Sequence, residues 1–416
     1  MLADELDDVI GVDTHRDEHV LVVLAAPAGA VLAGQAVPTN ARGYRETLRL
    51  AERYAAGRRA WAIEGTGSYG AGLTRHLQRE AVRVVEVDRP NRQRRRRRGK
   101  SDPQDAITAA RAAQSGDALG EAKTRDGNVE AMRVLRVARS SARKARTQAL
   151  NQMRSMISTA PEPIRAELRN LNVYRLLEHA AAYRPGQRRD VATLTKRTLR
   201  MLARRAQALE SEVAELDAIL EPLVAETAPA LAARPGIGTD CASALLVAAG
   251  DNPQRLRNEA TFAHLCGAAP LDASSGKHER HRLNRGGDRQ ANSALWHIVI
   301  TRMVYDPRTR DYIDRRMKEG LTKKEAFRCL KRYIAREVYN HLPRPHLALD
   351  SPEEHRFVAS RGWFWGRGSW GVERGPQQML GADRRFHRLS RLTSVWCLRP
   401  PTPRQGRRNP SGFRRC

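Results

Sequence analysis

With 416 residues, the chain is too long for a single compact core, and two or three domains are expected. Its 74 Lys and Arg residues against 46 Asp and Glu give a formal net charge of +28, which favours a polyanionic partner, most commonly nucleic acid, over a merely arginine-rich protein encoded by GC-rich DNA. The five cysteines show no paired spacing, so neither a disulfide framework nor a zinc cage is suggested. No apolar run is long enough to span a membrane, and we expect a cytoplasmic protein.

Residues 1–126 are predicted to form a mixed α/β domain. Three short strands within residues 8–36 are rich in β-branched residues and are separated by charged or Pro/Gly turns, which predicts a meander. Helix and strand patterns then alternate over residues 41–57, 59–66, 69–80 and 82–88. A further helix is expected from residue 102, because Pro103 suits a first helical turn and an alanine-rich run follows it.

The remainder of the chain is expected to be mainly helical before it becomes disordered. Residues 127–225 are long, charged and helical in pattern, and Leu209, Val213, Leu216 and Leu220 form an apolar seam suited to a partner helix in a coiled coil, or to the surface of the chain's own domain. Residues 226–345 predict a mainly α-helical domain that ends in a basic helix. Residues 346–416 are rich in Arg, Gly, Pro and Trp, which predicts a disordered tail.

Carboxylates fall at particular points of the predicted α/β domain. Asp13 lies in the first strand, on the face that it shares with Val9 and Gly11 by two-residue alternation. Glu64 stands at the end of a later strand, before a glycine-rich loop. Asp102 and Asp105 face the same side of a helix at its start. If the three elements meet at one end of the sheet, these four acids converge.

Each acid also has an ordinary explanation. Asp102 and Asp105 fit a helix N-cap and the third position of a capping box. Asp13 can pair with a buried arginine, and Glu64 can be a surface strand end. Four converging carboxylates, however, would repel one another unless hard cations such as Mg²⁺ or Mn²⁺ lay between them, and two such ions about 4 Å apart are suited to cutting a phosphodiester. The arginine run at residues 94–98 would then hold the phosphate backbone.

Several sequence motifs, in their order and spacing, resemble a known family. The segments IGVDTHRDEH, AIEGTGSYG and GKSDPQDA resemble the RuvC-like DEDD domain of bacterial insertion-sequence transposases of the IS110 type, relatives of the Piv DNA invertase. Further along, RPGIGTDCASALLVAAGD, FAHLCGAAPLDASSGK and NRGGDRQANSALW resemble the carboxy-terminal transposase domain of that family. The resemblance covers about residues 8–345 and implies a RuvC/RNase H-like α/β fold, a long helical coiled-coil segment and a mainly α-helical carboxy-terminal domain.

The resemblance also implies roles for particular residues. Asp13, Glu64, Asp102 and Asp105 match the catalytic, metal-binding acids of the RuvC-like domain, with Mg²⁺ or Mn²⁺ as the cofactor. Ser275 matches the nucleophilic serine, which is thought to form a covalent phosphoserine link to DNA. Members of the family resemble recombinases that a structured noncoding (bridge) RNA directs to donor and target DNA. They work as tetramers joined through coiled coils, so a homo-oligomer, a dimer or a tetramer, is expected here.

Two features near the predicted serine leave alternatives open. Lys277 stands where the family commonly has the second glycine of Ser-Gly-Gly, and Ser274 provides a neighbouring hydroxyl. A serine before glycine is otherwise most often a turn residue. His278 and His281 lie close by, but histidines among arginines in a polar loop are more often surface residues than catalytic bases.

Predicted nucleic-acid contacts fall in three places: the arginine run, the segment after Ser275, and PGIG at residues 235–238. PGIG resembles a helix-hairpin-helix, in which glycines let backbone amides approach a phosphate, although a plain turn between helices has the same pattern. The predicted nucleic-acid-binding residues are Arg94, Arg95, Arg96, Arg97, Arg98, Lys100, Gly236, Gly238, Lys277, Arg280, Arg282 and Arg285.

Three functions are compatible with these patterns. The leading prediction is a DNA transposase that excises and integrates an element by metal- and serine-dependent strand transfer. A structure-selective nuclease, such as a junction resolvase, would use the acids alone with water as the nucleophile. A basic nucleic-acid-binding protein without catalytic activity would use the acids only as caps and ion pairs.

Overall fold

The computed structural model of the chain describes residues 5–26, 28–87, 101–118, 120–272 and 281–343. By the contacts between its residues, the chain divides into a unit of residues 1–347 and a second unit of residues 348–416. The second unit and the whole of the predicted tail, residues 346–416, lie outside the described residues. Within the described ranges, no helix combines the length and the apolar character needed to cross a membrane. The domain boundaries predicted above stay predictions.

A five-stranded mixed sheet forms the amino-terminal part, as predicted. Its strands are β1 (Asp8–Thr14), β2 (Glu18–Ala25), β3 (Val31–Pro38), β4 (Arg59–Glu64) and β5 (Val84–Val87). Their order in the sheet is β3-β2-β1-β4-β5. The first three strands pair antiparallel as a meander, whereas β4 runs parallel to both β1 and β5. The carboxyl ends of β1 and β4 therefore meet at the same edge of the sheet.

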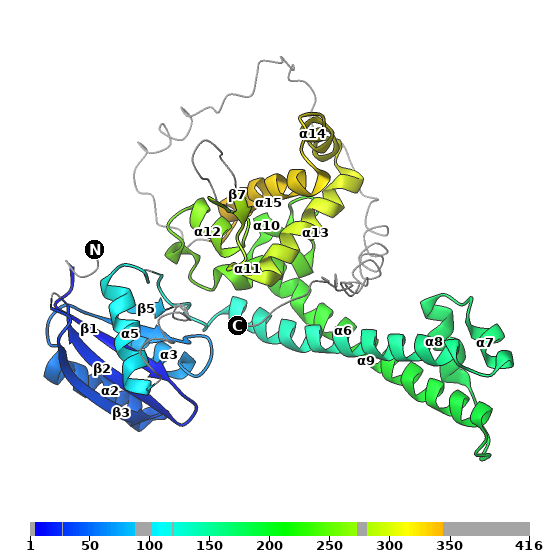
Figure 1. Cartoon of the computed structure of the whole chain (residues 1–416), viewed down its shortest axis with the longest axis horizontal. Helices are drawn as coiled ribbons and strands as arrows, with labels where there is room; N and C mark the ends of the chain where they lie inside the picture. Colours follow the sequence, from blue (N-terminus) through cyan, green and yellow to red (C-terminus); the bar gives the residue numbers. More distant parts are fainter. Residues whose placement is uncertain (1–4, 27, 88–100, 119, 273–280, 344–416) are drawn as a thin grey trace, which may run out of the picture. The chain divides into compact units, whose positions relative to one another are not determined.

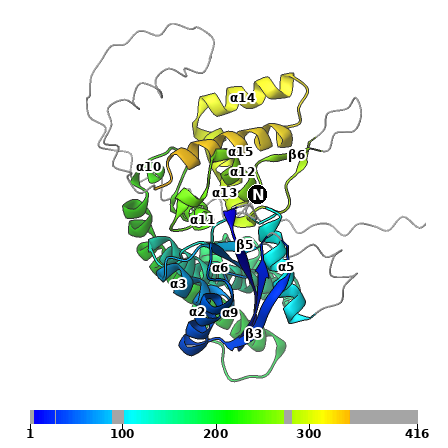
Figure 2. The same ribbon diagram turned by 90° about the vertical axis from the view of Figure 1, so that its left-hand side faces the viewer.

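Helices cover both faces of this sheet. Ile10 and Val12 of β1 pack in one buried cluster with α2 (Ala41–Tyr54) and α3 (Ala71–Arg79). Val9 packs in another, with the alanines of α5 (Asp102–Gln114). Figure 2 shows the two helices on one side of the sheet and α5 on the other. Strict alternation along β1 thus decides which of its side chains meet α5.

Two long helices, α6 (Asn128–Ser158) and α9 (Val191–Thr227), lie side by side (Figure 1). The start of α6 shares a buried cluster with the end of α9, and the end of α6 shares another with the start of α9, so the two run antiparallel. Two short helices, α7 (Glu162–Leu168) and α8 (Val173–Ala182), join them. Leu220 of the predicted seam is fully buried. One partner of that seam is therefore α6 of the same chain.

The carboxy-terminal part is mainly α-helical, as predicted. Its helices are α10 (Pro229–Ala232), α11 (Thr239–Ala249), the 3₁₀ turn η1 (Pro253–Arg255), α12 (Glu259–Leu265), α13 (Arg289–Tyr305), α14 (Pro307–Lys318) and α15 (Lys323–Asn340). Phe262 and Leu295 lie in its core with no exposed surface. A small antiparallel pair, β6 (Pro270–Asp272) and β7 (His281–Leu283), was not predicted from the sequence.

Hydrogen bonds join the start of α6 and the segment before it to the end of α11 and the loop after it. Gly127 is the N-cap of α6 and has no side chain to cap the helix. The carboxylate of Asp251 instead accepts from the backbone amides of Val129 (2.8 Å) and Glu130 (3.1 Å). Lys123 Nζ donates to the carbonyl of Val247 at 2.8 Å. The helix therefore begins on a cap supplied by a residue more than a hundred positions away.

Candidate functional site

Close packing at Gly11 brings α5 onto the first strand. A Cβ atom at position 11 would lie 2.0 Å from the backbone carbonyl oxygen of Ala106 and 2.9 Å from Cβ of Ala110. Only glycine permits this approach of helix to strand. It positions the first turn of α5, which carries Asp102 and Asp105, over the face of β1 that carries Asp13.

Three of the predicted acids come together there. Asp13 and Asp105 are buried, with 8% and 6% of their surfaces exposed, and Asp102 is partly exposed. His15 lies between two of them: its Nε2 atom is 3.0 Å from Oδ2 of Asp13 and 3.4 Å from Oδ1 of Asp102. The partner of Asp13 is thus a histidine and not the arginine considered above.

The electrostatics of Asp13 reflect this crowding. Burial raises the pKa of the Asp13 carboxyl, and the neighbouring carboxylates of Asp105 and Asp102 raise it further, whereas His15 lowers it. Removing water and adding like charge both disfavour the ionised form. A cation at this position would reverse that balance by favouring the ionised carboxylates.

The fourth predicted acid, Glu64, ends the neighbouring parallel strand. The register pairs Val12 with Ile63, and one further step puts Glu64 beside Asp13. Ala60 and Ala62, which alternate with Glu64, belong to the cluster that packs on α5, so Glu64 shares that face of the sheet. The Thr14 hydroxyl donates to the Glu64 carbonyl at 2.8 Å and ties the two strand ends together.

The start of α5 does not follow the capping pattern that Asp102 and Asp105 suggest. Ser101 is the N-cap residue, Asp102 is already inside the helix, and no side chain makes a capping hydrogen bond. The interpretation of the two acids as an N-cap and a capping box is therefore wrong. Their position in the first turn is still favourable, because the amino-terminal end of a helix carries partial positive charge.

The donor atoms fit a divalent cation. Asp13, His15 and Asp102 each offer one ligand atom, and these atoms all lie within 4.8 Å of one another. Carboxylate oxygens suit Mg²⁺ and Mn²⁺, and an imidazole nitrogen adds a donor for a transition metal. No other group of three such residues occurs among the described residues.

Sequence reasoning missed His15, although a signal was present. His15 follows Asp13 by two positions, so the alternation that placed Asp13 with Gly11 would also have placed His15 on that face. A cleft of about 560 Å³ opens beside it, lined by His15, Arg16 and Tyr69 and by residues of β2 and β3. None of the four acids lines this cleft, but the side chains of His15 and Asp102 are 39% and 44% exposed, so the site is open to solvent at these two residues.

The predicted nucleic-acid contacts lie elsewhere or outside the described residues. Gly236 turns the chain with φ of +75°, and Gly238 is the N-cap of α11 with open space where a side chain would be. Arg282 and Arg285 are exposed in and after β7. Among the described residues, no hydrogen bond or ion pair links Gly236, Gly238, Arg282 or Arg285 to Asp13, His15 or Asp102. Outside the described residues lie Ser274, Ser275, Lys277, His278 and Arg280, the arginines at 94–98, and Lys100.

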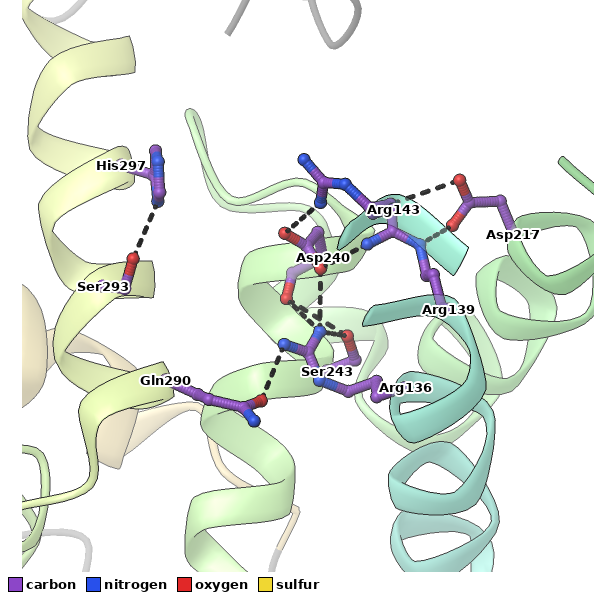
Figure 3. Close-up of polar contacts among 9 residues, drawn as sticks. All are labelled: Arg136, Arg139, Arg143, Asp217, Asp240, Ser243, Gln290, Ser293 and His297. Carbon is purple, nitrogen blue, oxygen red and sulfur yellow. Dashed lines mark hydrogen bonds and ion pairs between the residues drawn. The ribbon is translucent and has the colours of Figure 1, made fainter. Parts of the chain in front are cut away.

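An arginine ladder near Gly238 was also missed from the sequence (Figure 3). Arg136, Arg139 and Arg143 of α6 all meet the carboxylate of Asp240 in the first turn of α11, at 2.9, 2.8 and 3.7 Å. Arg139 also pairs with Asp217 of α9. Burial would raise the pKa of Asp240, but the arginines hold it below its usual value. The ladder therefore holds α6, α9 and α11 together.

Comparison with known proteins is consistent with this arrangement. A family model of DEDD transposases of the IS110 type, described as "Transposase", matches residues 10–160, and a model described as "Transposase IS116/IS110/IS902 family" matches residues 228–314. An insertion element IS110 uncharacterized 43.6 kDa protein of Streptomyces coelicolor is 37% identical over 123 residues, which cover 29% of this chain and 29% of that relative. The first match includes most of β1, the other four strands of the sheet and the α5 acids, and the second includes the helices from α10 to α13 and most of α14. The chain therefore belongs to the IS110 family of transposases, and its amino-terminal α/β domain is RuvC-like.

Proposed function

We propose that this protein is a DNA transposase that excises and integrates an insertion sequence by divalent-metal-dependent strand cleavage and transfer. The observation that carries the proposal is the gathering of Asp13, Asp102 and Asp105 at the carboxyl ends of two parallel strands, beside Glu64. Ligand sites of α/β sheets commonly lie outside such strand ends. The match of both parts of the chain to transposase families supports the same reaction.

The four acids are proposed to hold Mg²⁺, or Mn²⁺, as the cofactor. When bound there, a divalent cation supplies Lewis-acid stabilisation of the charge that develops on the phosphodiester oxygens. The carboxylates of Asp13 and Asp105 would hold it in a buried, water-poor setting, in which charge interactions are strong. The proposed role of the arginines at 94–98 and of Lys100 is to hold the phosphate backbone of the strand being cut.

Ser275 is proposed as the nucleophile. Its oxygen would form a bond to phosphorus while the bond from phosphorus to one sugar oxygen breaks, and that leaving oxygen would take up a proton. Lys277, Arg280, Arg282 and Arg285 would hold the phosphate during this exchange, and the glycines of PGIG would let the backbone approach a second phosphate. A structured guide RNA, donor and target DNA, and assembly as a dimer or tetramer complete the proposal. These roles rest on the family resemblance.

The test is covalent capture of DNA by the purified full chain. The protein is incubated with element-end DNA, RNA that co-purifies with it and Mg²⁺, and the products are separated on a denaturing gel. The expected result is a protein–DNA adduct that is absent in Ser275→Ala and in Asp105→Asn but present in Ser274→Ala. Loss of the adduct in Ser274→Ala alone would move the nucleophile to the neighbouring hydroxyl.

Two other outcomes would replace the proposal. Cleavage that persists in Ser275→Ala but is lost in Asp105→Asn would identify a metal-dependent nuclease or resolvase that uses water. DNA binding without cleavage, in wild type and at every divalent-metal condition, would identify a binding protein. A binding protein of this charge would still lose affinity steeply with added salt, so salt dependence alone does not separate the three functions.

A further inference from the structure

His15 lies beside the predicted acids, and its role in the site has not yet been accounted for. It is the first residue after β1, and its side chain is 39% exposed. It lies at the border between the acidic site and the open cleft of about 560 Å³. One ring atom, Nε2, faces carboxylates from two different elements, Asp13 on β1 and Asp102 on α5.

The separations between these atoms suit ligands that share one ion. Two ligands at right angles on an octahedral cation with bonds of about 2.1 Å lie about 3 Å apart. The Nε2 atom of His15 is 3.0 Å from the Asp13 oxygen and 3.4 Å from the Asp102 oxygen. A histidine that served only as the ion-pair partner of Asp13 would not need the second carboxylate on the same nitrogen.

We propose that His15 is a nitrogen ligand of the divalent cation held by Asp13 and Asp102, and that it makes this site prefer Mn²⁺ to Mg²⁺. The inference rests on the metal-dependent function proposed above. Mg²⁺ takes oxygen ligands almost exclusively, whereas imidazole suits transition-metal ions, so one nitrogen in the set changes which ion binds better.

A second histidine of the chain provides a matched control. His179 of α8 pairs through Nε2 with the carboxylate of Glu167, and within the described ranges this pair has no third donor that would complete a metal site. Both rings therefore have a carboxylate partner, but only His15 has two from separate elements. His179→Gln therefore tests whether a histidine next to a single carboxylate also contributes a nitrogen ligand to bound manganese.

The experiment measures the nitrogen on bound manganese directly. The purified full chain is loaded with one equivalent of Mn²⁺, and electron spin-echo envelope modulation is recorded for wild type, His15→Gln and His179→Gln. The expected result is ¹⁴N modulation from a coordinated imidazole in wild type and in His179→Gln, and its loss in His15→Gln. Modulation that persists in His15→Gln, or is missing from wild type that holds Mn²⁺, would overturn the inference.

Binding constants for the two ions give an independent measurement. Titration calorimetry is expected to show weaker Mn²⁺ binding in His15→Gln, on the order of tenfold, with a smaller change for Mg²⁺. Equal losses for the two ions would overturn the preference.

An Asp13→Asn variant separates this inference from the function on which it rests. If wild type binds Mn²⁺ and Asp13→Asn does not, the proposed metal site is supported, whether or not His15 is one of its ligands. If wild type binds no Mn²⁺, or if Asp13→Asn binds it as tightly, the metal centre itself fails and the inference fails with it.

Discussion

The Cα atom of Gly11 lies so close to the backbone of Ala106 that a methyl group at position 11 would sit 2.0 Å from the Ala106 carbonyl oxygen. This contact sets the height of α5 above the sheet. Because Asp102 lies one turn before Ala106 and Asp105 directly precedes it, the contact also sets the distance of both acids from Asp13.

Gly11→Ala should therefore damage both stability and metal binding. The new methyl group meets backbone atoms, which cannot rotate away, so overpacking should cost at least about 1–3 kcal/mol of unfolding free energy. We expect weaker Mn²⁺ binding as well, because α5 must move. Gly34→Ala is the control, since its Cβ would meet the nearest atom at an ordinary 3.6 Å. Urea unfolding and calorimetry check both effects, and equal behaviour of the two variants would contradict the argument.

His19 should make the protein sensitive to acid. Burial, and then the charge of His15, lower the pKa of His19 to about 4 from its usual value of 6.5. The unfolded chain therefore takes up a proton as the pH falls from 6.5 to 4, while the folded protein does not, and stability is lost over that window. The loss should approach about 3 kcal/mol near pH 4.

His19→Phe provides the comparison, because it keeps a ring that can stack on Tyr44 and has no titrating group. Unfolding free energies are measured by urea denaturation at a series of pH values. As the pH falls below 6.5, wild type should lose stability relative to His19→Phe. Parallel curves for the two proteins would show that His19 does not titrate differently on folding.

Lys123 should make the stability of the protein depend on pH in the alkaline range. Burial, and then the positive charges of Arg255 and Arg125, lower the pKa of Lys123 to about 8 from 10.5. Between these values the folded protein loses a proton that the unfolded chain keeps, so stability rises as the pH increases through the window. The unfolding free energy of wild type should therefore rise relative to that of Lys123→Met from pH 8 to 10.5. The exposed Lys324→Met should leave this pH dependence unchanged in the same denaturation series.

Asp240→Ala should weaken the ion pairs that hold α6, α9 and α11 together and so lower the stability of the protein. Removing the carboxylate leaves Arg136 and Arg139 without a shared acceptor, which should cost about 2 kcal/mol, as for other charge-assisted hydrogen bonds. Glu46→Ala, which removes an exposed ion pair with Arg42, should change thermal stability much less. Melting temperatures compare the two variants, and an equal effect would mean that Asp240 behaves as a surface residue.

The sequence was sufficient to predict the sheet and the helix with the acids, since both depend on local patterns. Two-residue alternation in β1 placed Asp13 with Gly11, and Pro103 with the following alanines indicated where α5 begins. His15 was missed because the same alternation was not continued past the strand end. The wrong capping interpretation of Asp102 has a similar origin: one residue in the helix boundary changes which side chain is the N-cap.

Long-range pairing accounts for what could not be predicted. The apolar seam of α9 indicates a partner helix but not which one, and the partner found here, α6, begins more than sixty positions earlier in the chain. β6 and β7 are each three residues long, too short for a periodic pattern. The arginine ladder depends on Asp240 facing α6, which no spacing within either helix reveals.

The Asp251 cap on α6 limits how parts of such proteins can be exchanged between relatives. The two family models match separate stretches of the chain, which invites treating each as an exchangeable module. Yet the first stretch contains the start of α6, and its amides at Val129 and Glu130 bond to Asp251 in the second. A chimera that joins halves of two relatives keeps this helix start only if the second half brings an acceptor at position 251. The two halves are therefore expected to be inherited, and engineered, as a pair.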